Sequence, residues 1–279
     1  MRVDTIWQYP VKSFIGNTVP LVSFDELGMV GDRMWAIRDL EKGGIRGAKK
    51  IGELMKFAAA YVDESLADVV ITLPNGDQVR SDNPQVNDVL SNVLGRKVQL
   101  DRRAPATDHE HFRRGAPDSN DMGEELRAVF GRDLDEPLPN FAVFPPEVVE
   151  FESPPGTYYD CYPLMVMTTS ALQSLKDALP NANPDVLRFR PTFVIDTPGE
   201  IGNPEFQWKG KSAKIGTLEI AFRDPCPRCV MTTREINADI PEDRSILRHI
   251  VRELDQNLGV YATVTTPGTI SVGDEVRFI

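Results

Sequence analysis

The chain has 279 residues, of which 41% are hydrophobic and 26% are charged, and its formal net charge is −11. This length suits one large globular domain or two ordinary ones. The acidic balance argues against bulk nucleic-acid binding, which needs clustered Lys and Arg, but it allows a local basic pocket for a small anion. With no secretory signal and no long apolar run, we expect a cytoplasmic protein with no membrane segment and with reduced thiols.

The first hundred residues are predicted to be mainly strands. Residues 1–13 alternate polar and apolar positions up to a proline, and residues 18–28 and 31–40 follow as further strands. Residues 67–82 form the clearest predicted hairpin, because Asn and Gly in its Pro-Asn-Gly-Asp turn tolerate positive φ. Residues 84–95 carry apolar side chains at helical spacing and end in a glycine, which predicts a short helix.

Residues 101–156 are rich in Asp, Arg, Glu and Pro, and their apolar periodicity is weak. We expect a long surface excursion with one or two helical turns around residues 124–130. A segment of this length within a domain is often a lid or a partner surface. His109 and His111 could share one face of an extended segment and bind a metal with neighbouring acids, although such a cluster in a polar segment is more often accidental.

Regular structure is predicted to resume near residue 158. The expected elements are a strand at 163–169, a helix at 169–179, a strand at 189–196, strands within 212–224, a helix at 243–258 and a closing hairpin at 261–279 that turns at Pro-Gly. Strands dominate and no βαβ rhythm is visible. The pattern therefore predicts an α+β, mainly β fold centred on a β-barrel.

Two cysteines, Cys226 and Cys229, stand two residues apart in a stretch that reads Asp-Pro-Cys-Pro-Arg-Cys. Structural zinc usually needs four ligands, and only Cys161 and three histidines of unsuitable spacing remain. A thioredoxin-type motif needs a following helix, whereas the residues here are β-branched and polar. Both thiols could also be small buried hydrophobes. However, Arg223 and Arg228 favour a thiolate and the prolines stiffen the backbone, which suits a loop that offers a thiolate to a soft metal centre.

Three further basic motifs are candidates for anion binding. Lys12 and Ser13 follow a proline at a strand end, and Arg33 stands at the mouth of a strand. Arg188 and Arg190 flank a phenylalanine, so in a strand they would share a face and could clamp an anion. Arg190 precedes a proline, which favours an extended backbone. Each motif alone could equally be a solvated surface feature.

The motifs in their chain order resemble a known family. They are YPVKS, LGMVGDRMWAIRD, YYDCYPLMVMTTSALQSL, RFRPTFVID, CPRCVMTT and PGTISVGDEV. This set is similar to the molybdenum cofactor sulfurase C-terminal (MOSC) domain with its N-terminal β-barrel partner, in the layout of the amidoxime-reducing components and their bacterial counterparts. The resemblance covers nearly the whole chain except about 101–150. It implies a MOSC-type β-barrel at 101–279, a packed β-barrel-like N-terminal domain at 1–100 and a few peripheral helices.

The resemblance also implies a molybdenum–molybdopterin cofactor (Moco), a pterin dithiolene with a phosphate tail, held between the two subdomains. Cys229 matches the family's protein ligand to molybdenum, and Asp160 lies in a segment close to the metal and could deliver protons. The cofactor contacts that it implies are Lys12, Ser13, Arg33, Cys161, Arg190, Thr192, Pro227 and Arg228. Thr192 stands where relatives often have Asn, Pro227 where some have Ser, and Cys161 where a small or hydroxylated residue is usual. Cys226 is expected to be a bystander.

The implied activity is that of an oxidoreductase that reduces N-hydroxylated (N–O) small molecules. Three cysteines cannot hold a built-in four-cysteine cluster, so electrons are expected from a separate flavin reductase with a haem or iron–sulfur carrier. A monomer is expected. Two alternatives stay open: a non-catalytic carrier of Moco or of sulfur, with a persulfide on Cys229, and a detoxifying protein that acts on hydroxylated purine analogues.

Overall fold

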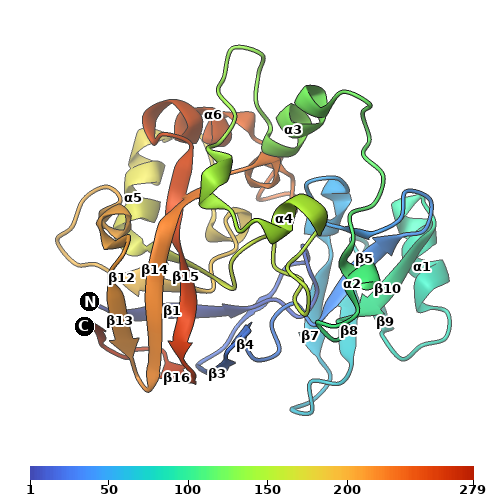
Figure 1. Cartoon of the computed structure of the whole chain (residues 1–279), viewed down its shortest axis with the longest axis horizontal. Coiled ribbons are helices and arrows are strands. Elements are labelled where there is room, and N and C mark those ends of the chain that lie inside the picture. Colours follow the sequence, from blue (N-terminus) through green and yellow to red (C-terminus); the bar gives the residue numbers. More distant parts are fainter.

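The computed structural model describes all 279 residues, and strands are its main component. It contains 17 strands, six α-helices and five short 3-10 helices, so the predicted α+β, mainly β class is confirmed. A large curled sheet lies on one side of the molecule and two small sheets lie on the other (Figure 1). None of its helices has the length and apolarity that crossing a membrane would require.

The largest sheet has eight strands in the order β17-β13-β14-β15-β11-β12-β1-β2. Their bounds are β1 (Arg2–Gln8), β2 (Asn17–Thr18), β11 (Leu164–Thr168), β12 (Phe193–Asp196), β13 (Ser212–Ile215), β14 (Leu218–Pro227), β15 (Asn257–Thr266) and β17 (Val276–Phe278). All neighbours are antiparallel except β11 and β12, which are parallel and connected through α5 (Thr169–Ala178). The sequence interpretation missed this βαβ unit because it occurs only once.

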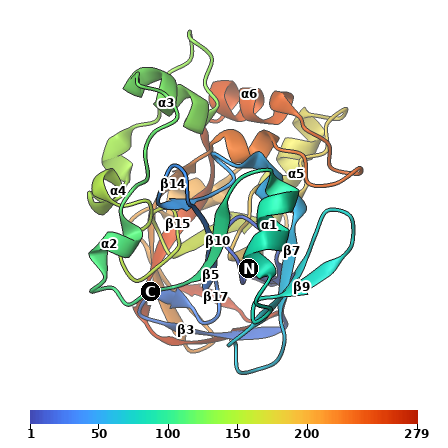
Figure 2. The same ribbon diagram turned by 90° about the vertical axis from the view of Figure 1, so that its right-hand side faces the viewer.

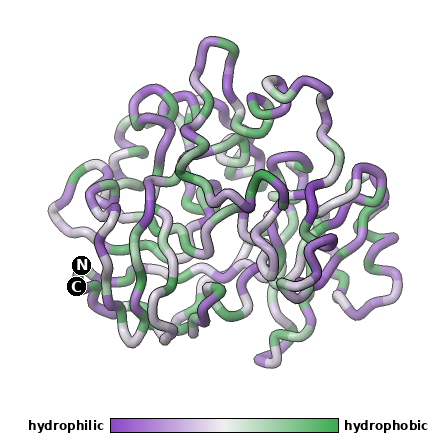
Figure 3. The backbone as a smooth tube through the Cα atoms, viewed as in Figure 1, coloured by the Kyte–Doolittle hydropathy of each residue, from purple (hydrophilic) through white to green (hydrophobic).

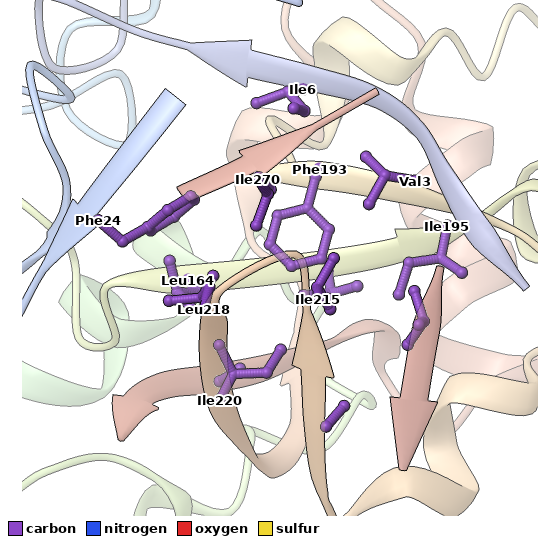
Figure 4. Close-up of a cluster of buried hydrophobic side chains, with 14 of the residues drawn as sticks. Val3, Ile6, Phe24, Leu164, Phe193, Ile195, Ile215, Leu218, Ile220 and Ile270 are labelled. Atoms are coloured by element: carbon purple, nitrogen blue, oxygen red, sulfur yellow. The ribbon is translucent and has the colours of Figure 1, made fainter. Parts of the chain in front are cut away.

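A second, three-stranded sheet closes the concave side of the large sheet. It consists of β16 (Gly268–Ser271), β3 (Leu21–Asp25) and β4 (Gly28–Met29). Side chains from both sheets form a core of 19 buried residues, which Figure 4 shows in part. The side chains of β11 alternate, because Leu164 and Val166 enter this core while Met165 and Met167 pack on the other face, towards α5 and α6 (Arg244–Glu253). We call these two sheets and their helices the barrel unit.

The remaining sheets form a smaller unit with its own core of 19 buried residues. Its elements are β5 (Trp35–Asp39), β6 (Ile45–Arg46), η1 (Gly52–Lys56), β7 (Ala58–Tyr61), β8 (Val69–Thr72), β9 (Gln78–Arg80), α1 (Val86–Leu94) and β10 (Val98–Arg102). The predicted helix is confirmed as α1, which buries Val86 and Leu90. Gly95 ends it in the left-handed conformation at φ 64°. We call residues 35–102 the small-sheet unit.

Residues 103–156, the middle segment, run along one flank of the molecule and cover the junction of the two units (Figures 1 and 2). Their helices are α2 (His109–Phe112), α3 (Met122–Phe130), η2 (Phe141–Val143) and α4 (Glu147–Glu150). The helical turns predicted near 124–130 are confirmed as α3. Its N-terminus is capped by the Asp121 side chain and it ends at left-handed Gly131. Figure 3 shows a hydrophobic stretch at the α4 turn of this otherwise polar segment.

Three predicted elements in the last third of the chain need correction. The closing hairpin does not form, since β16 pairs with β3 and β17 pairs with β13. The last helix ends at Glu253, because Asp255 and Gln256 have positive φ and lead into β15. The strand expected at 189–196 begins only at Phe193, after η3 (Val186–Arg188) and a left-handed residue. The other 3-10 helices are η4 (Pro204–Trp208) and η5 (Val230–Thr233).

The first residues of the chain belong to the barrel unit. Strand β1 pairs with β12, and the Trp7 backbone N–H donates to the Thr192 carbonyl at 2.9 Å. The chain then leaves towards the small-sheet unit through residues 9–15. The division at residue 100 stays a prediction, and strands from the two sides of it pair with each other, β1 with β12 and β3 with β16.

Candidate active site

A cavity of about 980 Å³ opens where the barrel unit, the small-sheet unit and the middle segment meet. Every residue proposed from the sequence for catalysis or cofactor binding lines it. They are Lys12, Ser13, Arg33, Asp160, Cys161, Arg190, Thr192, Pro227, Arg228 and Cys229. The chain order separates these residues by up to 217 positions, and the fold brings them together.

The cavity has two chemically different walls. We call the first the cationic wall and define it by Lys12, Arg33, Lys49, Arg190 and Arg228. We call the second the apolar wall, and the middle segment supplies all of it. Its members are Met122, Leu126, Val129, Phe130, Phe141, Phe144, Pro145, Pro146, Val148 and Val149.

Asp160 lies between two lysines of the cationic wall. Its Oδ1 is 2.5 Å from Lys12 Nζ, and its Oδ2 is 2.9 Å from Lys49 Nζ. Lys12 also donates to the Tyr158 carbonyl at 2.8 Å. The Asp160 side chain is 39% exposed; its partial desolvation opposes ionisation, but Lys12 and then Lys49 hold its pKa well below the usual value. The carboxylate therefore stays ionised and holds the Nζ atoms of two cavity-lining lysines, although burial lowers the pKa of Lys12 itself.

Lys49 lies on the turn after β6 and was not singled out from the sequence. Burial opposes its charge, yet Asp160 and then Cys229 raise its pKa above the usual value. The only local signal was a lysine in the glycine-containing turn Gly47-Ala48-Lys49-Lys50. Because its partner Asp160 lies more than a hundred residues later, sequence proximity could not reveal the pair.

Two arginines of the cationic wall stack on tyrosines. The Arg33 guanidinium lies 5.0 Å from the Tyr9 ring centroid and 5.2 Å from that of Tyr159, and it pairs with Asp32. The Arg190 guanidinium lies 4.2 Å from the Tyr9 centroid. Burial, together with the charge of Arg33, lowers the pKa of Arg190 to about 10.

Arg190 and Tyr159 each keep one buried polar group without a protein partner. Arg190 Nη1 donates to the Phe14 carbonyl, whereas Nη2 has no acceptor. The Tyr159 hydroxyl is also buried and unpaired. Buried polar groups are nearly always satisfied in folded proteins, and three of the ten unpaired side-chain groups of this chain belong to cavity-lining residues, namely Arg46, Tyr159 and Arg190.

Backbone strain also concentrates at this wall. Six non-glycine residues in the chain have left-handed φ, and three of them are Ser13 (71°), Arg33 (48°) and Arg190 (56°). Arg190 was expected to be extended because a proline follows it, so that prediction was wrong. Strained residues cluster at functional sites because the surrounding structure must hold them there.

Two predicted hydroxyl contacts face the cavity but already bind the backbone. Ser13 Oγ accepts from the Ala48 N–H at 2.9 Å, and Thr192 Oγ1 accepts from the Met165 N–H at 3.1 Å. Both groups therefore fix the loops that carry their neighbours.

The cysteine motif continues a strand rather than forming a loop, since β14 extends to Pro227. Cys226 is buried, and its Sγ accepts from Arg228 Nη1 at 3.2 Å, while Arg228 Nη2 donates to the Phe189 carbonyl at 2.7 Å. Cys229 follows at the start of η5, where it is partly exposed to the cavity. Burial raises the pKa of Cys161 to about 12. The three thiols therefore lie in three different environments.

Arg188 does not form the anion clamp that was expected with Arg190. The two residues do not share a strand face, because Arg188 ends η3. Its buried guanidinium donates to the carbonyls of Asn183, Arg234 and Pro241 at 2.6–2.9 Å. These bonds tie together the loops behind the cavity and leave little donor capacity for a ligand.

The histidine cluster of the middle segment is not a metal site. His109 and His111 lie in α2 rather than in an extended segment. His111 Nε2 is 2.5 Å from the Tyr158 hydroxyl, and its Nδ1 faces Arg38. Nowhere in the chain do three or more His, Cys, Asp or Glu side chains group to hold a metal ion.

The apolar wall was not recognised from the sequence. Phe130 is buried against the rings of Phe141 and Phe144, with centroid distances of 5.8 and 6.2 Å. The sequence does show large apolar residues within this polar segment. They have no regular spacing, however, so they did not predict that the segment forms an apolar surface.

Arg132 connects the apolar wall to the cysteine motif. It follows α3, is buried, and donates through Nη2 to the Arg228 carbonyl at 3.0 Å. Its Nε donates to Gln256 Oε1 at 3.1 Å. Burial lowers the pKa of Arg132 to about 10, with Cys229 acting in the opposite direction.

Comparisons with known proteins identify the family of the chain. The model of the MOSC domain matches residues 154–277, and that of the MOSC N-terminal beta barrel domain matches residues 1–110. Mitochondrial amidoxime reducing component 2 of Bos taurus is 23% identical to this chain, and the alignment covers 98% of this chain and 82% of the relative. The same component from Macaca fascicularis is 25% identical and that from Homo sapiens is 24% identical, with the same coverage. The crystal structure of the YUAD protein from Bacillus subtilis aligns over 99% of this chain and 94% of that chain at 8% identity, with a TM-score of 0.45, and supports no inference.

Proposed function

The chain belongs to the MOSC domain family, with its N-terminal beta barrel domain, and on this basis we propose that it is a Moco-dependent oxidoreductase. Its substrates in this proposal are N-hydroxylated small molecules, and its electrons come from a separate carrier protein. The observation that carries the proposal is the cationic wall, which gathers Lys12, Arg33, Lys49, Arg190 and Arg228 around the partly exposed thiol of Cys229 in an acidic protein.

The residues present fit a polyanionic, sulfur-containing cofactor. A phosphate tail needs donors, and Arg190 Nη2 and the Tyr159 hydroxyl are buried donors without protein partners. A soft metal prefers a thiolate, and Cys229 is the cavity's only thiol that is more than marginally exposed. When bound, Moco supplies two-electron oxygen-atom chemistry, while the protein supplies binding and orientation.

Within this proposal each residue of the wall has a definite task. Cys229 would be the protein ligand to the metal, and Lys12, Arg33, Arg190 and Arg228 would neutralise the cofactor's charge. Arg228 is held by Cys226 Sγ and the Phe189 carbonyl, so its orientation is set before any ligand binds. Preorganised donors of this kind bind an anion without reorganisation.

We assign Asp160 a positioning role in place of proton delivery. A carboxylate whose pKa lies well below its usual value carries no proton to give near neutral pH. Instead, its two oxygens hold the Nζ atoms of Lys12 and Lys49 in place, at distances of 2.5 and 2.9 Å. Lys49, whose charge is in turn favoured by Asp160 and Cys229, would be a further cofactor-facing cation.

Reduction of an N-hydroxyl group to an amine and water consumes two electrons and two protons. The chain has only three cysteines, which are too few for a four-cysteine cluster, so a flavin reductase with a haem or iron–sulfur carrier is the proposed donor. The relatives named above are amidoxime reducing components, which supports an N–O substrate here. A cytoplasmic location and a monomeric state remain predictions.

The direct test is metal and pterin analysis of the purified protein, followed by benzamidoxime reduction with a chemical electron donor. We expect stoichiometric molybdenum and product formation, both lost in Cys229→Ala. A well-folded protein that never acquires molybdenum from a competent host would refute the proposal.

A sulfur carrier is the second candidate, because Cys229 is partly exposed and electrostatically coupled to Lys49, Arg228 and Arg132. Cationic neighbours of this kind stabilise a thiolate or persulfide. Mass spectrometry that detects a single added sulfur on Cys229 without pterin would favour this alternative over the oxidoreductase.

A further inference from the structure

The apolar wall lies in a part of the chain that neither family model covers. The matched ranges end at residue 110 and resume at residue 154, whereas the wall extends from Met122 to Val149. It contributes ten of the 38 residues that line the cavity. The wall therefore lies between the matched ranges of the two family models.

Several side chains of the wall remain exposed although they are large and apolar. The exposed fractions are 64% for Met122, 44% for Phe141 and 81% for Val149. Contiguous exposed apolar groups on a soluble protein usually mark a binding surface. These groups face the same cavity as Cys229, so a ligand that covers them would also reach the cationic wall.

The wall is preformed rather than loosely attached. Phe130 is buried and supports the rings of Phe141 and Phe144 from behind. Arg114 holds α4 through a bond from Nε to the Val148 carbonyl at 3.0 Å. On the other side an ion pair between Lys50 and Glu125 fixes α3 to the small-sheet unit.

We propose that the apolar wall binds the uncharged aromatic body of the substrate, while its N-hydroxyl group faces Cys229. The inference rests on the proposed function and narrows its substrate class to N-hydroxylated compounds with an aromatic or bulky apolar body. The cavity volume of about 980 Å³ falls within the range of small-molecule pockets. A small molecule is the occupant because the wall faces a concave space shared with the cations, whereas a docked protein would need a broad outer surface.

The test measures binding without turnover. Benzamidoxime and acetamidoxime share the N-hydroxyl group and differ in the phenyl ring, so their dissociation constants are compared by calorimetry in the absence of reductant. Burying a phenyl-sized group is worth about 1.5–3 kcal/mol, so benzamidoxime should bind roughly 10- to 100-fold more tightly. Equal affinities for the two probes would overturn the proposal.

Variants then locate the binding surface. Phe141→Ser and Val149→Ser should each reduce the preference for benzamidoxime by about threefold to tenfold, since each removes part of the apolar contact. Leu134→Ser is the matched control, because Leu134 lies in the same segment, is 88% exposed and does not line the cavity. An equal loss in the control, or no loss in either wall variant, would contradict the assignment. Val149 is exposed enough for its substitution to leave folding intact if Phe141→Ser does not fold.

Two further outcomes separate this inference from the proposed function. If benzamidoxime binds with the expected variant pattern but is never reduced, the apolar substrate surface stands and the proposed reaction falls. If benzamidoxime is reduced and Val149→Ser weakens only the affinity for the electron-donor protein, the wall is a protein docking surface and the inference is wrong.

Discussion

The cationic and apolar walls line one cavity but are built on opposite physical principles. The cationic wall consists of buried, hydrogen-bonded and partly strained residues such as Lys12, Arg190 and Arg228. The apolar wall consists of exposed and half-buried side chains around one buried ring, that of Phe130. A buried charge is costly without partners, so each cation needs hydrogen-bond or ion-pair partners in a defined geometry. Apolar contacts are non-directional, so an apolar surface needs no such partners.

This contrast shows where the chain can change without losing its chemistry. A substitution in the cationic wall leaves a partner buried and unpaired, which costs more than the lost bond itself. A substitution at an exposed member of the apolar wall, such as Met122 or Val149, alters mainly the apolar area offered to a ligand. The first wall is covered by the family models and the second is not, which agrees with this difference.

The largest effect is expected from Cys229→Ala. Even residues that only support metal ligands change affinity by 10- to 100-fold, so loss of the ligand itself should reduce bound molybdenum by at least about 100-fold. Benzamidoxime binding at the apolar wall should persist, which separates the two walls. Elemental analysis and calorimetry on the same preparation check both statements, and simultaneous loss of both would show that the walls are not independent.

Asp160→Asn should have the next largest effect, because it removes the anion between Lys12 and Lys49. We expect the variant to retain the cofactor roughly tenfold more weakly, which is the lower end of the 10- to 100-fold range for residues that support metal ligands. Because folding lowers the pKa of Asp160, its ionised carboxylate stabilises the wild-type fold at pH values above the pKa of the unfolded chain. The difference in melting temperature between the wild type and Asp160→Asn should therefore be complete above about pH 4. It should disappear only in strongly acidic solution, as the pH falls through the low folded pKa.

The matched control for this pH profile is Asp118→Asn. Asp118 also faces two cations, Arg46 and Lys50, but at longer distances of 3.7 and 3.3 Å. The Asp118 side chain is 49% exposed and that of Asp160 is 39% exposed, so the two differ mainly in distance, and a loose pair of this kind is worth at most about 1 kcal/mol. An Asp160→Asn profile that matched the control would contradict the positioning role.

Arg132→Met tests the connection between the walls. It removes the bonds to the Arg228 carbonyl and to Gln256 while it keeps much of the side-chain volume. Leaving these buried acceptors unpaired should lower the free energy of unfolding by about 1–3 kcal/mol in urea titrations. Arg244→Met is the control, since its guanidinium is largely exposed and should change stability by less than about 0.5 kcal/mol.

The smallest effect is expected from Cys226→Ser. A hydroxyl can replace the thiol as acceptor for Arg228 Nη1, so the change should cost less than about 1 kcal/mol and bound molybdenum should fall by less than about fivefold. Cys226→Ala should do more harm, because it leaves that donor unpaired. If Cys226→Ser retained as little molybdenum as Cys229→Ala, both thiols would hold the metal.

The sequence predicted features that depend on nearby residues. Helix α1 was found because its apolar residues recur at helical spacing and because it ends at a glycine that can adopt positive φ. The residues of the cationic wall other than Lys49 were found through the order of short motifs rather than through their geometry. What they do beyond lining one cavity stays a prediction.

Features that depend on distant partners could not be predicted. The Lys49–Asp160 pair joins positions 111 residues apart, and the pairing of β16 with β3 replaced a plausible local hairpin. The left-handed conformation of Arg190 opposes the local preference of a residue before proline and depends on contacts with Phe14 and Tyr9. In each case tertiary contacts outweigh the local preference that sequence patterns report.

The pairing of β1 with β12 has a consequence for how the protein is made. Residues 2–6 leave the ribosome first, but their partners at 193–196 emerge about 190 residues later. At a synthesis rate of roughly 5–20 residues per second, the edge of β1 that pairs with β12 stays unpaired for about 10–40 s. Free strand edges attract other chains, so nascent protein in this interval should depend on chaperones more than the finished fold does. Ribosome-bound chains stopped before residue 193 should therefore bind chaperones more strongly than chains released after it.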